Sequence, residues 1–189
     1  LGPGEILKGR ASMFDYNVVL IGFMGAGKST IAELLRTGWG MERIEMDTLI
    51  EEREGMRISK IFETKGEPYF RDLETELLIE LQARSNAVIS CGGGVPMRER
   101  NVAEMKKNGR VVLLTAHPET ILERVKDNHD RPLIENNKTV EGISALMEAR
   151  RERYMAAADL VIETDRKTGE EICRELVEKL HRMEEEASR

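Results

Sequence analysis

Residues 22–29, GFMGAGKS, are the stretch from which the fold of this chain can be worked out. They fit the pattern G-x-x-x-x-G-K-[ST], whose glycines let backbone N–H groups point into one concavity that fits phosphate oxygens. A short apolar run, VVLI at residues 18–21, precedes the pattern, and a helical spacing of Ile31, Leu34 and Leu35 follows it. The sequence therefore predicts a strand, a phosphate-binding loop and a helix, in that order.

Two side chains of this loop carry its chemistry. Lys28 would set an ammonium group against the β- and γ-phosphates of a nucleotide, and the Ser29 hydroxyl is placed to ligate Mg²⁺. The helix that begins here adds the positive end of its dipole. We therefore predict nucleotide binding. The loop by itself does not indicate which reaction the nucleotide serves.

Strand-like aliphatic runs and helical patterns alternate along the rest of the chain. The runs lie at residues 43–46, 87–90, 111–114 and 160–162. Helical patterns lie at residues 48–54, 58–84 (interrupted at 66–68), 118–126, 143–158 and 169–186, whereas residues 128–138 are polar and loop-like. This alternation predicts an α/β fold, and the continuous aliphatic runs predict a parallel sheet with helices on both faces.

Composition narrows the class of protein. The 189 residues fit one domain, and a net charge of −6 with 4% aromatic residues argues against a nucleic-acid surface. No apolar run approaches the ~20 residues that cross a bilayer, and two cysteines cannot build a disulfide framework. No heptad pattern or long apolar stripe indicates an oligomer. We therefore expect a cytoplasmic monomer, with its domain at residues 13–189 and a linker or disordered arm at residues 1–12.

Several charged residues stand near the ends of predicted elements. Glu45 and Asp47 end the second strand, on the side of the sheet where ligands collect, although Asp47 could also cap the helix at residues 48–54. Arg71 lies in a helical stretch, where a purely structural role, as the i,i+3 partner of Glu74, is the alternative to a role in a site.

Three consecutive glycines, Gly92, Gly93 and Gly94, follow the strand at residues 87–90. Glycines weaken regular structure but allow a backbone to approach a ligand closely. We interpret Cys91, just before them, as a small buried residue rather than a nucleophile.

From residue 18 to about residue 180 the chain resembles the shikimate kinase family. The matching segments are GFMGAGKST (22–30), MDTLIEEREGMRISKIFETKGEPYFRDLE (46–74), CGGG (91–94), DRPLI (130–134) and RRERY (150–154). The ordered combination of a strand-end aspartate, F-R-x-x-E, triple glycine, R-P-L and R-x-x-x-Y is far more specific than the phosphate loop alone.

The resemblance implies an architecture and a reaction. The architecture is a three-layer P-loop kinase fold with a five-stranded parallel sheet, a substrate-binding insertion at about residues 47–84 and a lid at about residues 128–138. The reaction is ATP-dependent phosphorylation of the 3-hydroxyl of shikimate, with Mg²⁺ as cofactor, in chorismate and aromatic amino-acid biosynthesis. The expected partners are the two small substrates, without nucleic acid or membrane.

The resemblance also implies roles for individual residues. Asp47 would take the proton of the attacking hydroxyl, Arg71 and Arg150 would hold the shikimate carboxylate, and Arg131 would close over the transferring phosphates. Arg124 and Arg166 would flank the adenine. The implied ATP-binding residues are Gly25, Ala26, Gly27, Lys28, Ser29, Thr30, Arg124, Arg131 and Arg166. The implied shikimate-binding residues are Asp47, Arg71, Gly92, Gly93, Gly94 and Arg150.

One position departs from the family pattern, and one register is open. The family usually has Asp-x-Asp where this chain has Glu45–Met46–Asp47. Ser29 is expected to ligate Mg²⁺ directly, whereas Glu45, one methylene longer than aspartate, would reach it through water. The R-x-x-x-Y spacing selects Arg150, but a shift of one residue would select Arg151.

Two other functions remain open on the sequence. A small-molecule kinase of the same build could act on gluconate or a nucleoside monophosphate, and a regulatory module could bind nucleotide without turnover. Arg71 and Arg150 favour a carboxylate substrate. The presence of Lys28, Asp47 and Arg131 argues against a module that has lost catalysis.

Overall fold

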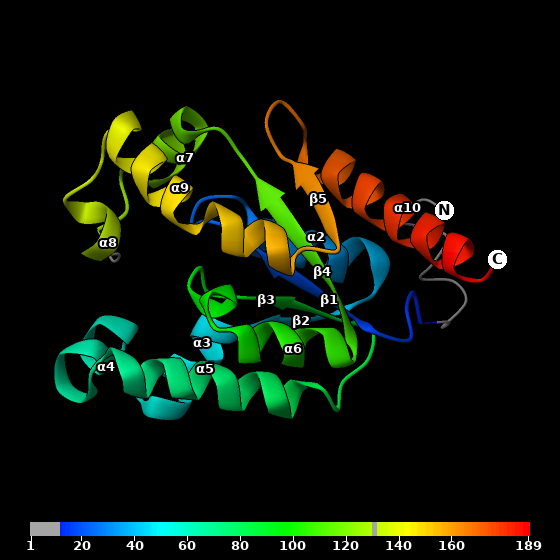
Figure 1. Ribbon diagram of the computed structural model, residues 1–189, viewed down its shortest axis with the longest axis horizontal. Helices are drawn as coiled ribbons and strands as arrows, with labels where there is room; N and C mark the ends of the chain where they lie inside the picture. Colours follow the sequence, from blue (N-terminus) through cyan, green and yellow to red (C-terminus); the bar gives the residue numbers. More distant parts are fainter. Residues whose placement is uncertain (1–11, 130–131) are drawn as a thin grey trace.

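Five parallel strands form one sheet in the order β2-β3-β1-β4-β5 (Figure 1). The structure, a computed structural model, describes residues 12–129 and 132–189. The strands are β1 (Asn17–Ile21), β2 (Glu42–Glu45), β3 (Ala87–Ser90), β4 (Gly109–Thr115) and β5 (Leu160–Glu163). The predicted α/β class and the five-stranded parallel sheet are confirmed.

The central strand β1 pairs with β3 on one side and β4 on the other. Val19 lies level with Ile89 in β3 and with Val111 in β4. Every residue of β1 is buried, as its continuous apolar sequence predicts for a strand covered on both faces. Because β2, β3 and β1 are parallel neighbours, the segments that follow them emerge at the same edge of the sheet.

Helices cover both faces of this sheet. They are α2 (Lys28–Trp39), α3 (Met46–Glu54), α4 (Ile58–Lys65), α5 (Glu67–Leu81), α6 (Glu99–Lys107), α7 (Pro118–Val125), α8 (Pro132–Glu135), α9 (Val140–Ala157) and α10 (Gly169–Ala187), with a 3₁₀ turn η1 (Val95–Met97). Helix α2 packs against β1, β3 and α10, whereas α6 and α9 pack against β4. In the described part of the chain, no helix combines the length and the apolar character that a membrane span requires.

Helix ends follow from local sequence. Helix α2 ends at Gly40, whose φ of 70° is the left-handed conformation that glycine adopts without steric cost. Helix α10 begins with a capping box. The Thr168 hydroxyl accepts from the Glu171 amide at 3.2 Å, and the Glu171 carboxylate accepts from the Thr168 amide at 2.7 Å.

Two elements after β3, η1 and α6, were not predicted. The buried residues of α6 are Asn101, Glu104 and Met105, so its inner face is mostly polar and few apolar residues mark the helix in the sequence. The segment at residues 128–138, predicted as a loop, contains the single-turn helix α8, which is too short for periodicity to reveal. The predicted arm at residues 1–12 lies outside the described residues, apart from residue 12.

Asp47 does not cap a helix, so that alternative interpretation was wrong. Helix α3 begins at Met46, two residues before the predicted start at residue 48. Its N-cap position is Glu45, which makes no side-chain capping bond. Met46, predicted as the last residue of the second strand, is instead the first residue of α3, and it is fully buried. Asp47 therefore lies in the first turn of α3, beside the end of β2.

Packing of α5 gives a direct test of the core. Leu78 is 0% exposed, whereas its neighbour Ile79 is 42% exposed. We expect Leu78→Ala to lower the free energy of unfolding by about 2–5 kcal/mol, because it removes buried methyl groups and leaves a cavity. Ile79→Ala, the matched control, should change it by less than about 1 kcal/mol. Urea denaturation measures both, and equal losses would contradict the packing described here.

Candidate active site

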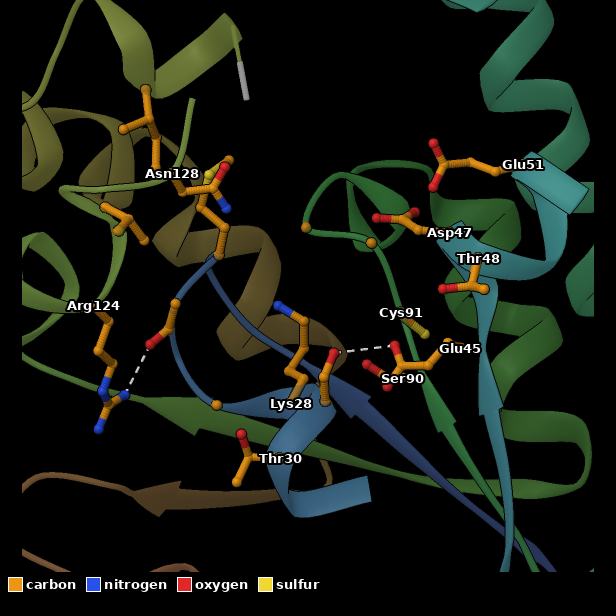
Figure 2. Close-up of a pocket in the computed structure, with 18 residues that line it drawn as sticks. Lys28, Thr30, Glu45, Asp47, Thr48, Glu51, Ser90, Cys91, Arg124 and Asn128 are labelled. Carbon is orange, nitrogen blue, oxygen red and sulfur yellow. Dashed lines mark hydrogen bonds between the residues drawn. The ribbon is translucent and has the colours of Figure 1, made fainter. Parts of the chain in front are cut away.

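The loop after β1 lines a cavity of about 340 Å³ at the carboxyl edge of the sheet (Figure 2). Gly25 has a φ of +79°, and a Cβ there would lie 2.8 Å from Val125 Cγ1, so the loop requires glycine at this position. Lys28 Nζ donates to the carbonyls of Gly22 at 2.6 Å and Phe23 at 3.1 Å. These bonds hold the ammonium group beside the loop that the motif assigns to phosphates.

Ser29 and Glu45 meet at the side of this cavity. The Ser29 hydroxyl donates to Glu45 Oε2 at 3.1 Å (Figure 2). Arg43 contacts the other oxygen, Oε1, at 3.1 Å. Among residues 12–129 and 132–189, no cluster of three His, Cys, Asp or Glu side chains could hold a metal on its own. A hydroxyl and a carboxylate fit Mg²⁺, which takes oxygen ligands and commonly completes its shell with phosphate oxygens and water.

The triple glycine after β3 makes room for three charged side chains. A Cβ on Gly92 would lie 2.8 Å from Asp47 Oδ1, and one on Gly93 would lie 3.1 Å from Arg150 Nη1. A Cβ on Gly94 would overlap the Arg71 guanidinium, with its Cζ only 2.7 Å away. The glycines are thus required by side chains from α3, α5 and α9, which they allow to converge around one loop.

These side chains line a second cavity of about 260 Å³. Its lining includes Arg71, Arg150 and Asp47. The two cavities share Met24, Asp47, Glu51, Gly92, Gly93 and Asn128. A carboxylate, Asp47, therefore stands where the phosphate-loop cavity opens into a cavity that carries two guanidinium groups.

The structure settles the register at the start of R-x-x-x-Y. Arg150 lines the second cavity, whereas the Arg151 side chain is 72% exposed and lies 3.7 Å from Glu148. One position along a helix rotates a side chain by about 100°, which turns Arg151 away from the cavity.

Arg71 makes the helical pair that its spacing predicts and also lines the cavity. Its Nη1 lies 2.7 Å from Glu74 Oε1, and its Cζ lies 5.3 Å from the centre of the Phe70 ring. Glu74 is 1% exposed, and its Oε2 has no hydrogen-bond partner among the described residues. Burial raises the pKa of Glu74 to about 7, although the Arg71 guanidinium opposes this rise.

The two arginines expected at the adenine have different surroundings. Arg124 Nη1 donates to the Gly25 carbonyl at 2.8 Å (Figure 2). It also lies 3.4 Å from Oγ1 of Thr164, the residue after β5, and so ties α7 and this residue to the loop. Arg166 follows β5 with a φ of 58°, is exposed, and lines neither cavity.

Comparison with known proteins identifies the family. The sequence profile of shikimate kinase matches residues 24–181. A shikimate kinase of Dehalococcoides mccartyi is 41% identical over 168 residues, which cover 89% of this chain and 95% of that protein. The chain belongs to the shikimate kinase family. The structure of shikimate kinase from Acinetobacter baumannii in complex with shikimate has a TM-score of 0.78 and 34% identity, covering 89% and 92% of the two chains.

A gluconokinase from Sinorhizobium meliloti is also similar, but with a TM-score of 0.56 and 16% identity this likeness shows the fold alone. Membership of the shikimate kinase family therefore favours a shikimate kinase over the two alternatives that the sequence left open. These were a kinase of gluconate or a nucleoside monophosphate, and a regulatory module that binds nucleotide without turnover. Family membership leaves the residue roles to be argued from geometry.

Several lining residues of this shikimate kinase fold were not singled out in the sequence. They are Met24, Thr48, Glu51, Arg57, Ile58, Ser59, Phe62, Ser90, Val125, Asn128 and Ile134. Glu51 could have been found, because it lies four residues after Asp47 and so shares its helix face. Its Oε2 accepts from the Ile58 amide at 3.0 Å and thereby caps α4.

Other predicted residues have different outcomes. Thr30 lines the first cavity, whereas Ala26 is buried and lines neither. Arg131 lies outside the described residues. Cys91 is buried, which raises the pKa of its thiol and agrees with its interpretation as a packing residue.

The raised pKa of Glu74 predicts a pH dependence of stability. A carboxyl with an ordinary pKa of 4.5 and a folded-state pKa of about 7 binds its proton more tightly when folded. Its contribution to stability is therefore full below pH 4.5 and is lost as the pH rises through 7. Relative to Glu74→Gln, the wild-type protein should lose on the order of 2 kcal/mol of unfolding free energy between pH 5 and pH 8.

Glu76→Gln is the matched control, because Glu76 is an exposed acid on the same helix. The unfolding free energy, measured by urea denaturation at both pH values, should change with pH as much in this control as in the wild-type protein. It should change less in Glu74→Gln. An equal change of unfolding free energy with pH in all three proteins would show that Glu74 does not titrate as described.

Proposed function

We propose that this chain transfers the terminal phosphoryl group of ATP to the 3-hydroxyl of shikimate, giving shikimate 3-phosphate and ADP. The observation that carries the proposal is the junction at Asp47, where the phosphate-loop cavity meets a cavity with two guanidinium groups. A phosphate donor and a carboxylate-bearing alcohol would fit the two sides of this junction. This reaction belongs to chorismate and aromatic amino-acid biosynthesis.

The nucleotide would occupy the first cavity. Backbone N–H groups of the loop and the Lys28 ammonium would hold the β- and γ-phosphates, with Ser29 and Thr30 at the start of α2. Arg124, bonded to the loop carbonyl of Gly25, would lie against the adenine, with Arg166 on the turn that closes its other side. Both adenine roles come from family resemblance; Arg124 lines the first cavity, whereas Arg166 lines neither.

Ser29 would ligate Mg²⁺ directly, and Glu45 would reach it through water. When bound, Mg²⁺ supplies positive charge that neutralises the phosphate oxygens. The contact of 3.1 Å between Ser29 and Glu45 supports this assignment, because it brings a hydroxyl oxygen and a carboxylate oxygen side by side in the lining of the phosphate-loop cavity.

Shikimate would occupy the second cavity with its carboxylate on Arg71 and Arg150. A planar guanidinium offers two parallel N–H donors, which match the two oxygens of a carboxylate. The opposite end of the substrate would then face Asp47, whose carboxylate orients the attacking hydroxyl and accepts its proton. Gly92, Gly93 and Gly94 would line the substrate without side chains of their own.

Closure would complete the site. Asn128 and Ile134, both within the proposed lid at residues 128–138, line the first cavity. Arg131 between them would stabilise charge on the transferring phosphoryl group, and closure would exclude water that could hydrolyse ATP. The proposed layout is one domain at residues 13–189, with the substrate-binding insertion at residues 47–84. A cytoplasmic monomer remains our expectation.

A thermal shift comparison tests the choice of substrate most directly. With ADP and Mg²⁺ present, shikimate should raise the unfolding temperature, whereas gluconate and a nucleoside monophosphate should leave it unchanged. A response to gluconate alone would replace the proposed substrate.

Asp47→Asn tests the proposed base. Asparagine keeps the shape of the side chain but lacks the charge that accepts a proton, so kcat should fall by about 10²–10⁴-fold. If Asp47 only positions the hydroxyl, the variant should instead raise the KM for shikimate with a smaller effect on kcat. Steady-state kinetics separate the two, and unchanged values of both would remove Asp47 from the mechanism.

Arg150→Ala tests the carboxylate grip. A hydrogen bond to a charged group contributes about 1.5–3 kcal/mol, so the KM for shikimate should rise roughly 10- to 150-fold while the KM for ATP stays nearly constant. Arg150→Lys should restore only part of the loss, because an ammonium lacks the two-pronged geometry. Arg151→Ala is the exposed neighbouring control and should behave like wild type. A silent Arg150→Ala would refute the grip.

A further inference from the structure

The tyrosine of R-x-x-x-Y has a structural partner that the proposed reaction does not use. Tyr154 lies four residues after Arg150 on α9, and its side chain is buried, with 5% of the residue exposed. Its hydroxyl donates to the Gly93 carbonyl at 2.6 Å. Residues four apart share one helix face, so Arg150 and Tyr154 reach the same glycine from the same side.

Helix α5 repeats this arrangement with different chemistry. Thr75 lies four residues after Arg71, and its hydroxyl donates to Asn101 Oδ1 at 2.6 Å. Asn101 Nδ2 in turn donates to the Val95 carbonyl at 2.9 Å. Thr75 is 5% exposed and Asn101 is 0% exposed, so this chain of bonds is shielded from water. It connects α5 to the residue that follows Gly94.

The glycine loop needs such attachments because it has no side chains to pack. Glycine loses more backbone freedom on folding than any other residue, and three in a row leave the position of the loop to its backbone bonds. Arg71 and Arg150 lie against this loop from opposite helices. Any shift of the loop would change how closely each guanidinium can approach, and small errors in donor placement weaken a two-point grip on a substrate.

We infer that Tyr154, together with the Thr75–Asn101 pair, acts as a set of positioning residues that fasten the glycine loop to α9 and α5. By doing so they set the separation of Arg71 and Arg150. Burial raises the pKa of the Tyr154 hydroxyl, which keeps its proton available for donation. The inference rests on the proposed function, because the consequence for a substrate is a weaker hold on the shikimate carboxylate.

Two substitutions remove the hydroxyls while keeping the volume of each side chain close to the original. Tyr154→Phe and Thr75→Val should each raise the KM for shikimate about 3- to 10-fold, as expected for the loss of one hydrogen bond. The KM for ATP should stay within about twofold, since neither residue lines the phosphate-loop cavity. Thr75→Ser keeps the hydroxyl and should restore most of the shikimate affinity.

Tyr16→Phe is the matched control. Tyr16 is also buried, at 6% exposed, but it precedes β1 and so lies at the opposite end of that strand from the phosphate loop. Its KM for shikimate should match wild type even if its stability changes. An equal rise in the Tyr16→Phe and Tyr154→Phe variants, or a parallel rise in the KM for ATP, would overturn the positioning role.

Hydrogen exchange tests the same inference without substrate. The Val95 amide donates to the Gly92 carbonyl at 3.1 Å and reports on the order of the loop. Its exchange should be faster in Tyr154→Phe and in Thr75→Val than in Tyr16→Phe, and unchanged exchange would overturn the inference. If the wild-type protein fails to phosphorylate shikimate, the proposed function fails, while the exchange experiment still decides whether these residues hold the loop.

Discussion

Parallel pairing of three neighbouring strands is the constraint on which the site depends. Because β2, β3 and β1 run in the same direction, the chain leaves all three at one edge. The phosphate loop follows β1, Glu45 ends β2 and Asp47 lies just beyond it, and the triple glycine follows β3. Segments that are tens of residues apart in sequence thus become neighbours at one edge of the sheet. The helices that connect the strands bring their side chains to the same edge.

The triple glycine converts this convergence into a cavity. With any side chain at Gly92, Gly93 or Gly94, the carboxylate of Asp47 or the guanidinium of Arg150 or Arg71 would be displaced. This arrangement buries an acid, Glu74, beside Arg71. Its desolvation is unfavourable and raises its pKa to about 7. A structure built only for stability would favour an apolar residue there, whereas Glu74 orients an arginine that faces the cavity.

Glu45 is held by contacts on both of its carboxylate oxygens. Arg43 binds one oxygen and Ser29 contacts the other, so both oxygens of this side chain have defined positions. Glu33 accepts from Arg43 at 2.9 Å and extends this chain of charges along α2. These contacts join α2 and β2 at the edge of the sheet where the phosphate loop ends.

Local sequence determined the class of the fold and much of the site. Aliphatic runs predicted the strands, and G-x-x-x-x-G-K-[ST] predicted the phosphate loop, because both signals depend on residues close together in the chain. The place of Asp47 at the end of the second predicted strand already marked it as a candidate, whereas family resemblance added Arg150 and the expected roles of Asp47 and Arg71. Helix α6 was not predicted from the sequence, because Asn101 and Glu104 lie on its buried side, where an amphipathic helix usually carries apolar residues.

Only the tertiary structure decided the questions that depend on distant contacts. Spacing selected Arg150 but left a shift to Arg151 open, because the choice rests on which face of α9 meets the glycine loop. Nor could sequence show that Asp47 lies within α3, or that Thr75 reaches Val95 through Asn101. Periodicity reports the environment of a residue along its own element. The partner that a side chain meets is set by the packing of elements that are far apart in sequence.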